Sequence, residues 1–320
     1  MNRGNAYSMP ILSIRHLTRY RYRNPVGLGE HRMMFRPREG HDQRILSHDI
    51  RISPTPARLR SVHDVFGNSV GVVGFKGRAR ELSFESFVRL EHTPLPAFAD
   101  IDGEIELYTG AMPFAYSPDD LPDLAQSMQR LHPDPQGVVD QWARRFVHRV
   151  GSTPLQTLLS EMTQAIYAEF KYSKRLEMGS QTPIQTLELR SGSCRDYAIR
   201  MIEAVRSLGL AARFVSGYIY SPHASAAHRG RIGGGHTHAW VRVYLPACGW
   251  VEFDPTNGIV GNADLVRVAI ARDPRQAVPL HGTWAGAAAD YIGMDVEVDV
   301  RAEIEGLAQL SQPRAVAVAG

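Results

Sequence analysis

The chain has 320 residues, of which 43% are hydrophobic and 22% charged, and its formal net charge is +3. This length and composition are typical of a globular protein with room for about two domains. The basic residues are spread along the chain, which argues against nucleic acid as the main partner. No apolar run reaches the roughly 18 residues of a membrane span, and the opening residues lack the apolar segment of a secretion signal. We therefore expect a cytoplasmic protein with no membrane partner.

The first part of the chain, residues 9–95, is expected to form an antiparallel β domain of the sandwich kind. Short apolar runs alternate here with turn signals, as in "LTRYRY" before "NPVG" and in "SVHDVFGNSVGVVGF". In "ELSFESFVRLE" apolar side chains recur at every second position, as on one face of a strand. Residues 1–8 show no periodicity, and both Met1 and Met9 remain open as the start of translation.

Residues 96–136 have a different character. They are rich in proline, aspartate and glycine, as in "HTPLPAFADIDGE" and "LHPDPQG", and predict a linker wrapped on the surface with at most one short helical turn. At the other end, residues 303–320 are expected to be a flexible tail. The part between these segments, residues 137–302, is predicted to be an α+β core.

This core begins with three stretches of helical periodicity. The first covers residues 138–150 and the second covers residues 155–170. The third lies in "SGSCRDYAIRMIEAVRSLG", where Ser193 is a good N-cap, Asp196 follows as in a capping box, and a glycine ends the pattern. Cys194 is therefore close to the first helical position.

A cysteine at a helix start is suited to nucleophilic chemistry. The thiolate is the nucleophile, and the unpaired backbone N–H groups and dipole of a helix N-terminus favour the anion. The same N–H groups can stabilise an oxyanion after the sulfur has attacked a carbonyl. Alternatively, Cys194 is a small buried residue that closes the cap. The second cysteine, Cys248, is expected to be an incidental exposed thiol, and no disulfide framework is expected.

A hairpin is predicted to supply the partners of this cysteine. If "HAWVRVYL" and "WVEFDPT" pair about the turn "PACG", Val241 lies opposite Val251 and His238 lies opposite Asp254. A shift by two residues would keep each side chain on the same face, so the faces are better determined than the register. Opposed side chains lie about 4.5 to 5.5 Å apart at Cβ, close enough for a carboxylate to accept a proton from imidazole. Taken singly, the histidine is also consistent with a surface residue and the aspartate with a turn.

The three segments resemble a known family. "SGSCRDYA", "THAWVRVYL" and "GWVEFDPTNG" are similar to three motifs of the bacterial transglutaminase-like superfamily, whose core is papain-like, and residues 11–95 are similar to the β-rich region that often precedes this core. The resemblance implies that Cys194 is the nucleophile, His238 the general base and acid, and Asp254 the residue that orients the histidine. No cofactor is expected.

The function expected from these residues is cysteine-dependent acyl transfer on amide or peptide bonds through a thioester. The family includes cross-linking enzymes, peptidases, amidases and members that have lost their catalytic residues. Hydrolysis by a cysteine protease or amidase is favoured over cross-linking, with a peptide or protein amide as substrate. The alternative is a catalytically silent binding module. Oligomeric state is left open.

Several neighbours are candidates for substrate binding. Trp240 and Trp250 share a hairpin face with the histidine and would shield the site, line a groove or simply pack. Tyr172 and Gln185 precede the cysteine and are weak candidates for a second oxyanion donor. Arg195 would either attract a substrate carboxylate or face solvent.

A histidine-rich loop offers a competing interpretation. "SPHASAAHRGRIGGGHT" has the length and glycine content of an active-site flap. Its histidines, with one residue of the next strand and one cysteine, would form a zinc site from His223, His228, His236, His238 and Cys248. The chain has neither a His-Glu-x-x-His nor a Cys-x-x-Cys motif, and no calcium loop is visible, so no metal is expected.

Overall fold

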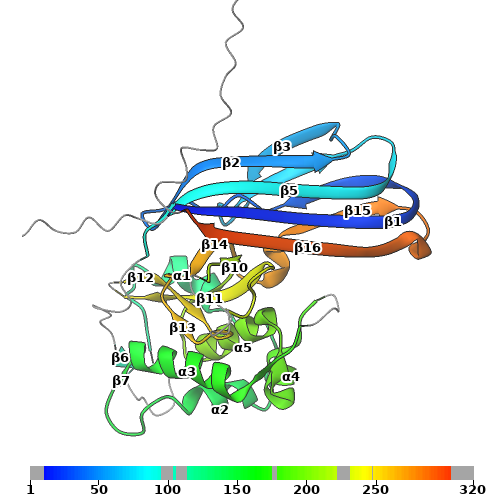
Figure 1. The fold of residues 1–320 in the computed structure, drawn as a ribbon. Coiled ribbons are helices and arrows are strands. Elements are labelled where there is room, and N and C mark those ends of the chain that lie inside the picture. Colours follow the sequence, from blue (N-terminus) through cyan, green and yellow to red (C-terminus); the bar gives the residue numbers. More distant parts are fainter. Residues whose placement is uncertain are drawn as a thin grey trace, which may run out of the picture.

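The computed structural model describes residues 11–94, 104–105, 114–174, 179–221, 231–246 and 248–303. An antiparallel sheet of long strands forms one layer, and a mixed unit of helices on a smaller sheet forms the other (Figure 1). The expected α+β class, with a β domain preceding a core of helices on a second sheet, is confirmed.

The upper layer is built around β1, a strand of 23 residues whose buried and exposed side chains alternate over much of its length. The strand order is β2-β5-β1-β4-β3, and two late strands also pair with β1. The sheet consists of β1 (Ile11–Met33), β2 (Gln43–Ser53), β3 (Arg58–His63), β4 (Ser69–Gly74), β5 (Arg78–His92), β15 (Leu280–Ala285) and β16 (Tyr291–Ala302).

The late strands correct the expected domain limits. The sequence pattern places residues 280–302 in the core, yet β16 pairs with the first half of β1, from Leu12 opposite Ala302 to Tyr22 opposite Tyr291. Periodicity identifies such a segment as a strand but contains no information about its partner, which here is distant in the sequence. The N-terminal β domain is therefore discontinuous, and the core predicted at 137–302 ends before β15.

The lower layer combines helices with a five-stranded sheet of order β13-β12-β11-β10-β14. Its sheet strands are β10 (Ala212–Ile219), β11 (His238–Leu245), β12 (Gly249–Asp254), β13 (Ile259–Val260) and β14 (Leu265–Ala271). Its helices are α1 (Leu121–Met128), α2 (Val138–Arg144), α3 (Leu155–Glu169), α4 (Pro183–Leu189) and α5 (Cys194–Ser207). Short pieces complete the chain: β6 (Glu104–Ile105), β7 (Thr153–Pro154), β8 (Lys171–Tyr172), β9 (Ser191–Gly192), and the 3-10 turns η1 (Pro274–Gln276) and η2 (Ala288–Asp290).

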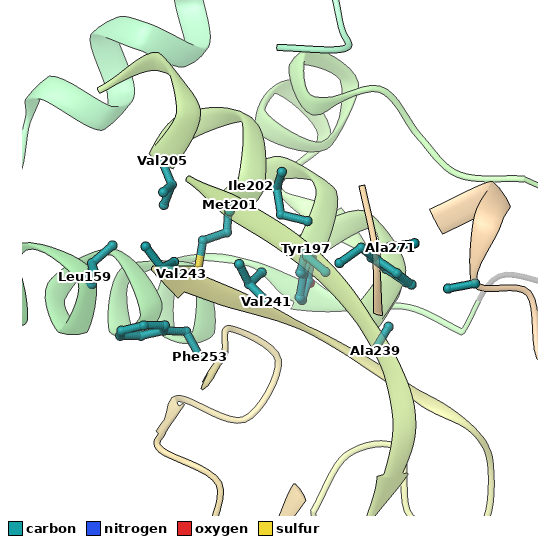
Figure 2. Packing of buried hydrophobic residues seen from close by; sticks show 14 of the residues in the cluster. Leu159, Tyr197, Met201, Ile202, Val205, Ala239, Val241, Val243, Phe253 and Ala271 are labelled. Carbon is teal, nitrogen blue, oxygen red and sulfur yellow. The ribbon is translucent and has the colours of Figure 1, made fainter. Parts of the chain in front are cut away.

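Helix α5 packs its apolar face on this sheet. Met201, Ile202 and Val205 lie against Val241 and Val243 of β11, and all are buried (Figure 2). The hydrophobic periodicity predicted this face, and burying each such side chain contributes about 1.5–3 kcal/mol. The core therefore fixes the start of α5 relative to β11.

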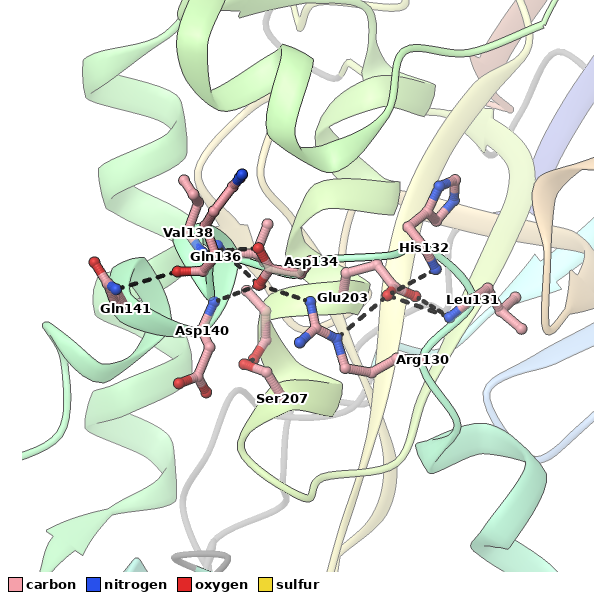
Figure 3. A network of polar contacts seen from close by, with 12 residues as sticks. Arg130, Leu131, His132, Asp134, Gln136, Val138, Asp140, Gln141, Glu203 and Ser207 are labelled. Carbon is pink, nitrogen blue, oxygen red and sulfur yellow. Dashed lines mark hydrogen bonds and ion pairs between the residues drawn. The ribbon is translucent and has the colours of Figure 1, made fainter.

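The predicted linker is only partly a surface wrap. It contains α1, an eight-residue helix rather than one short turn, and Tyr116 is buried with its hydroxyl donating to the Tyr244 carbonyl at 2.8 Å. Glu203 of α5 accepts hydrogen bonds from the backbone N–H groups of Leu131 and His132 (Figure 3). These contacts anchor residues 129–137 to α5. Residues 95–103 and 106–113, and the predicted tail beyond residue 303, lie outside the described part of the chain.

Buried polar contacts join the two layers. Arg267 of β14 hydrogen-bonds both carboxylate oxygens of Asp42, which follows β1, and its Nη1 lies 3.0 Å from Glu252 of β12. Asn68 bridges the backbone of Ile270, donating to its carbonyl at 2.7 Å and accepting from its N–H at 2.9 Å. Because these groups are buried and paired, the layers form a continuous packed interface.

Candidate active site

Cys194 is the first residue of α5, as predicted, and its side chain is partly exposed. Both the N–H and the hydroxyl of Ser193 donate to the Asp196 carboxylate at 2.8 Å. The other oxygen of Asp196 accepts from the backbone N–H of Gln181 at 2.7 Å. Asp196 therefore fixes the turn that presents the cysteine, which is the capping role expected from the sequence.

The hairpin brings a histidine and a carboxylate together, although in a different register from the predicted one. Val241 lies opposite Phe253 instead of Val251, a slip of two residues that leaves every side chain on its expected face. The slip arises because the strands close at Leu245 opposite Gly249, and this glycine has a φ of +70°. His238 is consequently not directly opposite Asp254.

His238 and Asp254 nevertheless form a buried pair. The ring Nε2–H of His238 donates to Oδ2 of Asp254 at 2.8 Å, and Oδ1 of Asp254 accepts from the Thr256 N–H at 2.9 Å. Burial lowers the pKa of His238, but the charge and hydrogen bond of Asp254 outweigh it, and the Cys194 thiol adds to them, so that the pKa is raised to about 10. The ring is thus held as an imidazolium at neutral pH.

The second ring nitrogen of His238, Nδ1, has no ordinary hydrogen bond within the described residues. It is the nitrogen available to the thiol, since Nε2 is bonded to Asp254 and the thiol contributes to the raised pKa. Cys194 and His238 line one small cleft. Its other lining residues are Arg195, Phe214, Ser216, Thr237, Ala239, Pro274, Ala277, Val278 and Pro279. A sulfur and an imidazolium facing a shared cleft can carry out nucleophilic acyl transfer.

The chain's two regions match two family models. Residues 12–91 match the bacterial transglutaminase-like N-terminal region, and residues 141–255 match the transglutaminase-like superfamily. The chain belongs to the transglutaminase-like superfamily. The second match includes all three residues of the cysteine, histidine and aspartate constellation.

The chain is also similar to individual proteins. An uncharacterized protein of Mycobacterium tuberculosis is 28% identical, over 94% of this chain and 97% of its own length. A protein-glutamine gamma-glutamyltransferase of Pseudomonas aeruginosa is 27% identical, over 42% of this chain and 17% of its own. The crystal structure of a presumed cysteine protease from Cytophaga hutchinsonii covers 92% of this chain and 90% of its own with a TM-score of 0.66 and 17% identity, and has the same fold.

The transglutaminase-like core buries Trp240 completely. Its ring lies against the His238 ring, with centroids 6.0 Å apart and an angle of 26° between the planes. The other contacts of Trp240 are in an apolar cluster of Val215, Ile219, Ile259, Leu265 and Ile270. Trp240 therefore shields the imidazole from water and does not line the cleft. Trp250 packs against Tyr244 at the other end of the hairpin.

The two weak candidates for an oxyanion donor have different positions. Tyr172 pairs through β8 with Gly192 of β9, and its pKa is raised to about 12 by burial and then by the charges of Cys194, Asp196 and Asp254. Its hydroxyl thus stays protonated near the cysteine. Gln185 is exposed and caps α4, where its side chain accepts from the Thr182 N–H at 3.0 Å. The suggestion that Gln185 reaches the oxyanion was therefore wrong.

The zinc interpretation finds no support among the described histidines. His236 accepts from the Lys174 ammonium at 2.9 Å and donates to the Val296 carbonyl at 3.1 Å, while His238 is bonded to Asp254. No three potential metal ligands gather in the described part of the chain, and His223 and His228 lie outside it. Within the same residues, no helix combines the length and apolar character needed to cross a bilayer.

A glycine of the predicted flap touches the site. Gly233 has a φ of +98°, and a Cβ added to it would lie 2.5 Å from His238 Nδ1. Gly235 has a similar φ of +84° with open space around a Cβ. We expect Gly233→Ala to displace the ring or the loop and to slow alkylation of Cys194 about 100-fold. Gly235→Ala has the same backbone strain without the clash and should keep the wild-type rate. Equal rates in both variants, measured with iodoacetamide, would contradict this role of Gly233.

Proposed function

We propose that Cys194, His238 and Asp254 form a catalytic triad that transfers acyl groups from amide or peptide bonds through a thioester. The observation that carries the proposal is the position of His238, which donates to buried Asp254 at 2.8 Å and shares the cleft with Cys194 at the start of α5. The substrate proposed is a peptide or protein amide. Membership of the superfamily supports thiol-dependent acyl transfer as the reaction class.

The proposed reaction has two halves. The Cys194 thiolate attacks the carboxamide carbon, and the oxyanion is stabilised by N–H groups at the start of α5, with the Tyr172 hydroxyl as the second candidate donor. The imidazolium of His238 then gives its Nδ1 proton to the departing amine, and the C–N bond breaks to leave a thioester. Water or an amine next attacks the thioester while His238 takes its proton, which releases the acyl product and restores the thiolate.

Alkylation kinetics test the activated nucleophile directly. The rate of iodoacetamide alkylation at Cys194, located by peptide mass, is measured between pH 4 and pH 9 in the wild type and in His238→Ala. We expect rapid labelling below pH 7 that is lost in the variant, because the imidazolium stabilises the thiolate. Cys248, exposed at the hairpin tip, gives an internal comparison in the same samples. A Cys194 profile that follows Cys248 would overturn the proposal and favour the silent binding module.

Hydrolysis is proposed over cross-linking, and product analysis separates the two. A panel of peptide carboxamides is incubated with and without a primary amine, and the products are weighed by mass spectrometry. Hydrolysis leaves the free carboxylic acid whether or not amine is present, whereas transamidation adds the mass of the amine. Cys194→Ala should yield neither product.

A further inference from the structure

Asn257, three residues beyond the hairpin aspartate, is buried beside it. Its Nδ2 donates to Oδ2 of Asp254 at 2.8 Å, the same oxygen that accepts from His238. The same amide hydrogen-bonds both backbone groups of Ile232 in the glycine-rich loop. Its Oδ1 accepts from the Ile232 N–H at 2.8 Å, and its Nδ2 donates to the Ile232 carbonyl at 3.0 Å. Rotating the amide by 180° would lose all three contacts, so its orientation is determined by its partners.

The loop segment that Asn257 holds is the part that touches the imidazole. Gly233 follows Ile232 and lies against the Nδ1 side of His238. Beyond it, the Gly235 carbonyl accepts from the Val298 N–H of β16 at 2.9 Å. The loop is thus tied to the β domain on one side and to the orienting carboxylate, through Asn257, on the other.

We propose that Asn257 is a positioning residue, which fixes the Asp254 carboxylate and the 231–237 loop as one unit and so sets where His238 presents Nδ1 to the thiol. This proposal rests on the proposed catalytic function. Asn257 touches neither the thiol nor the cleft and acts through its two partners. The sequence did not single it out, because its role depends on a loop conformation that periodicity does not encode.

The charged and titratable groups around the site determine what an added charge would do. Facing the imidazole are Asp254 from β12 and Cys194 from α5, and close to these lie Asp196 of α5 and the Tyr172 hydroxyl of β8. Arg195 of α5 lines the same cleft. Asn257→Asp keeps the shape of the side chain, removes the Nδ2 donor and places a second carboxyl group against Asp254. Two carboxyl groups at this distance share one proton at low pH. When this proton leaves, the pair gains a second negative charge, and this charge disfavours the Cys194 thiolate.

The experiment repeats the Cys194 alkylation profile in Asn257→Asp and Asn257→Ala. In Asn257→Asp we expect the midpoint of the plot of alkylation rate against pH to move up by about one pH unit. At a fixed pH below the midpoint, alkylation of Cys194 would then be about tenfold slower. In Asn257→Ala, we expect faster amide deuterium exchange in residues 231–237 and slower alkylation. Asn24→Asp is the matched control, because Asn24 also donates to a carboxylate, Asp290 at 2.9 Å, at a position remote from the site.

The outcomes separate this inference from the proposed function. If the wild-type Cys194 profile is that of an ordinary thiol, the proposed function fails. If that profile is activated but Asn257→Asp has the same midpoint as the wild type, the positioning role alone is overturned. A shift of equal size in Asn24→Asp would also overturn it, since the effect would then be a general consequence of added charge. Thermal unfolding of each variant verifies that the fold is retained.

Discussion

Under the proposed mechanism, replacing Asp254 with asparagine is expected to slow amide turnover by about 10²- to 10⁴-fold while leaving the fold intact. Burial lowers the pKa of His238, but the charge and hydrogen bond of Asp254, with a smaller contribution from Cys194, raise it to about 10. The asparagine would keep the size of the side chain but remove its charge, so the pKa of the ring would fall and the imidazolium would be disfavoured at pH 7. Less of the imidazolium that the proposed reaction uses to protonate the leaving amine would then be present.

The raised pKa of His238 also predicts how the free energy of unfolding depends on pH. The folded pKa of His238 lies above its ordinary value of 6.5. The stabilisation from the charged pair is therefore complete below pH 6.5 and is lost as the pH rises through about 10. Urea unfolding of the wild type should show this loss, and the Asp254→Asn protein should not. The control is Asp295→Asn, an exposed partner of Arg21 on β16. Equal pH profiles for wild type and Asp254→Asn would contradict the assignment.

Local sequence patterns predicted the parts of the site that depend on local structure. The start of α5 follows from a capping box and an apolar face, and the shared face of His238 and Asp254 follows from the two-residue period of a strand. The shared face survives the error in the hairpin register, because a slip of two residues leaves each side chain on the same face. These rules placed Cys194 at a helix start and His238 on the same strand face as Asp254, and the family resemblance added the roles proposed for the three residues.

The features that the sequence did not predict depend on distant or irregular segments. Pairing of β16 with β1 joins residues far apart in the chain, and one strand pattern is compatible with many partners. Gln185 was expected near the site, yet it caps α4. Gln181 instead lies beside the turn that precedes Cys194, and its backbone N–H donates to Asp196. Which of the two glutamines lies beside Cys194 depends on the path of the loop before α4, and local sequence patterns do not determine that path. The role of Asn257 was not predicted either, because it also depends on the path of a loop.

The second large effect is expected at the interface between the layers, where Arg267 lies between Asp42 and Glu252. Arg267→Ala leaves buried Asp42 without its cation, whereas Glu252 keeps a second partner, Arg242, at 3.0 Å. Removing one partner from a buried ion pair costs about 3–5 kcal/mol in the free energy of unfolding. Arg21→Ala is the control, because its pair with Asp295 is about half exposed and contributes at most about 1 kcal/mol. Urea unfolding at pH 7 measures both losses.

At acid pH, the difference in the free energy of unfolding between the wild type and Arg267→Ala should become smaller. Burial raises the pKa of Asp42, but hydrogen bonding and the charge of Arg267 outweigh it and lower this pKa to about 2. The stabilisation is therefore fully present above the ordinary pKa of 3.8 and is lost as the pH falls through about 2. Without Arg267 the carboxyl group protonates more readily, so the variant regains stability relative to the wild type below pH 4. A loss at pH 7 no larger than that of Arg21→Ala would show that the interface does not depend on this buried cation. A large loss in the free energy of unfolding would mean that the packing of the two layers depends on this buried charge network. The contact of β16 with the loop beside His238 would then depend on the same network.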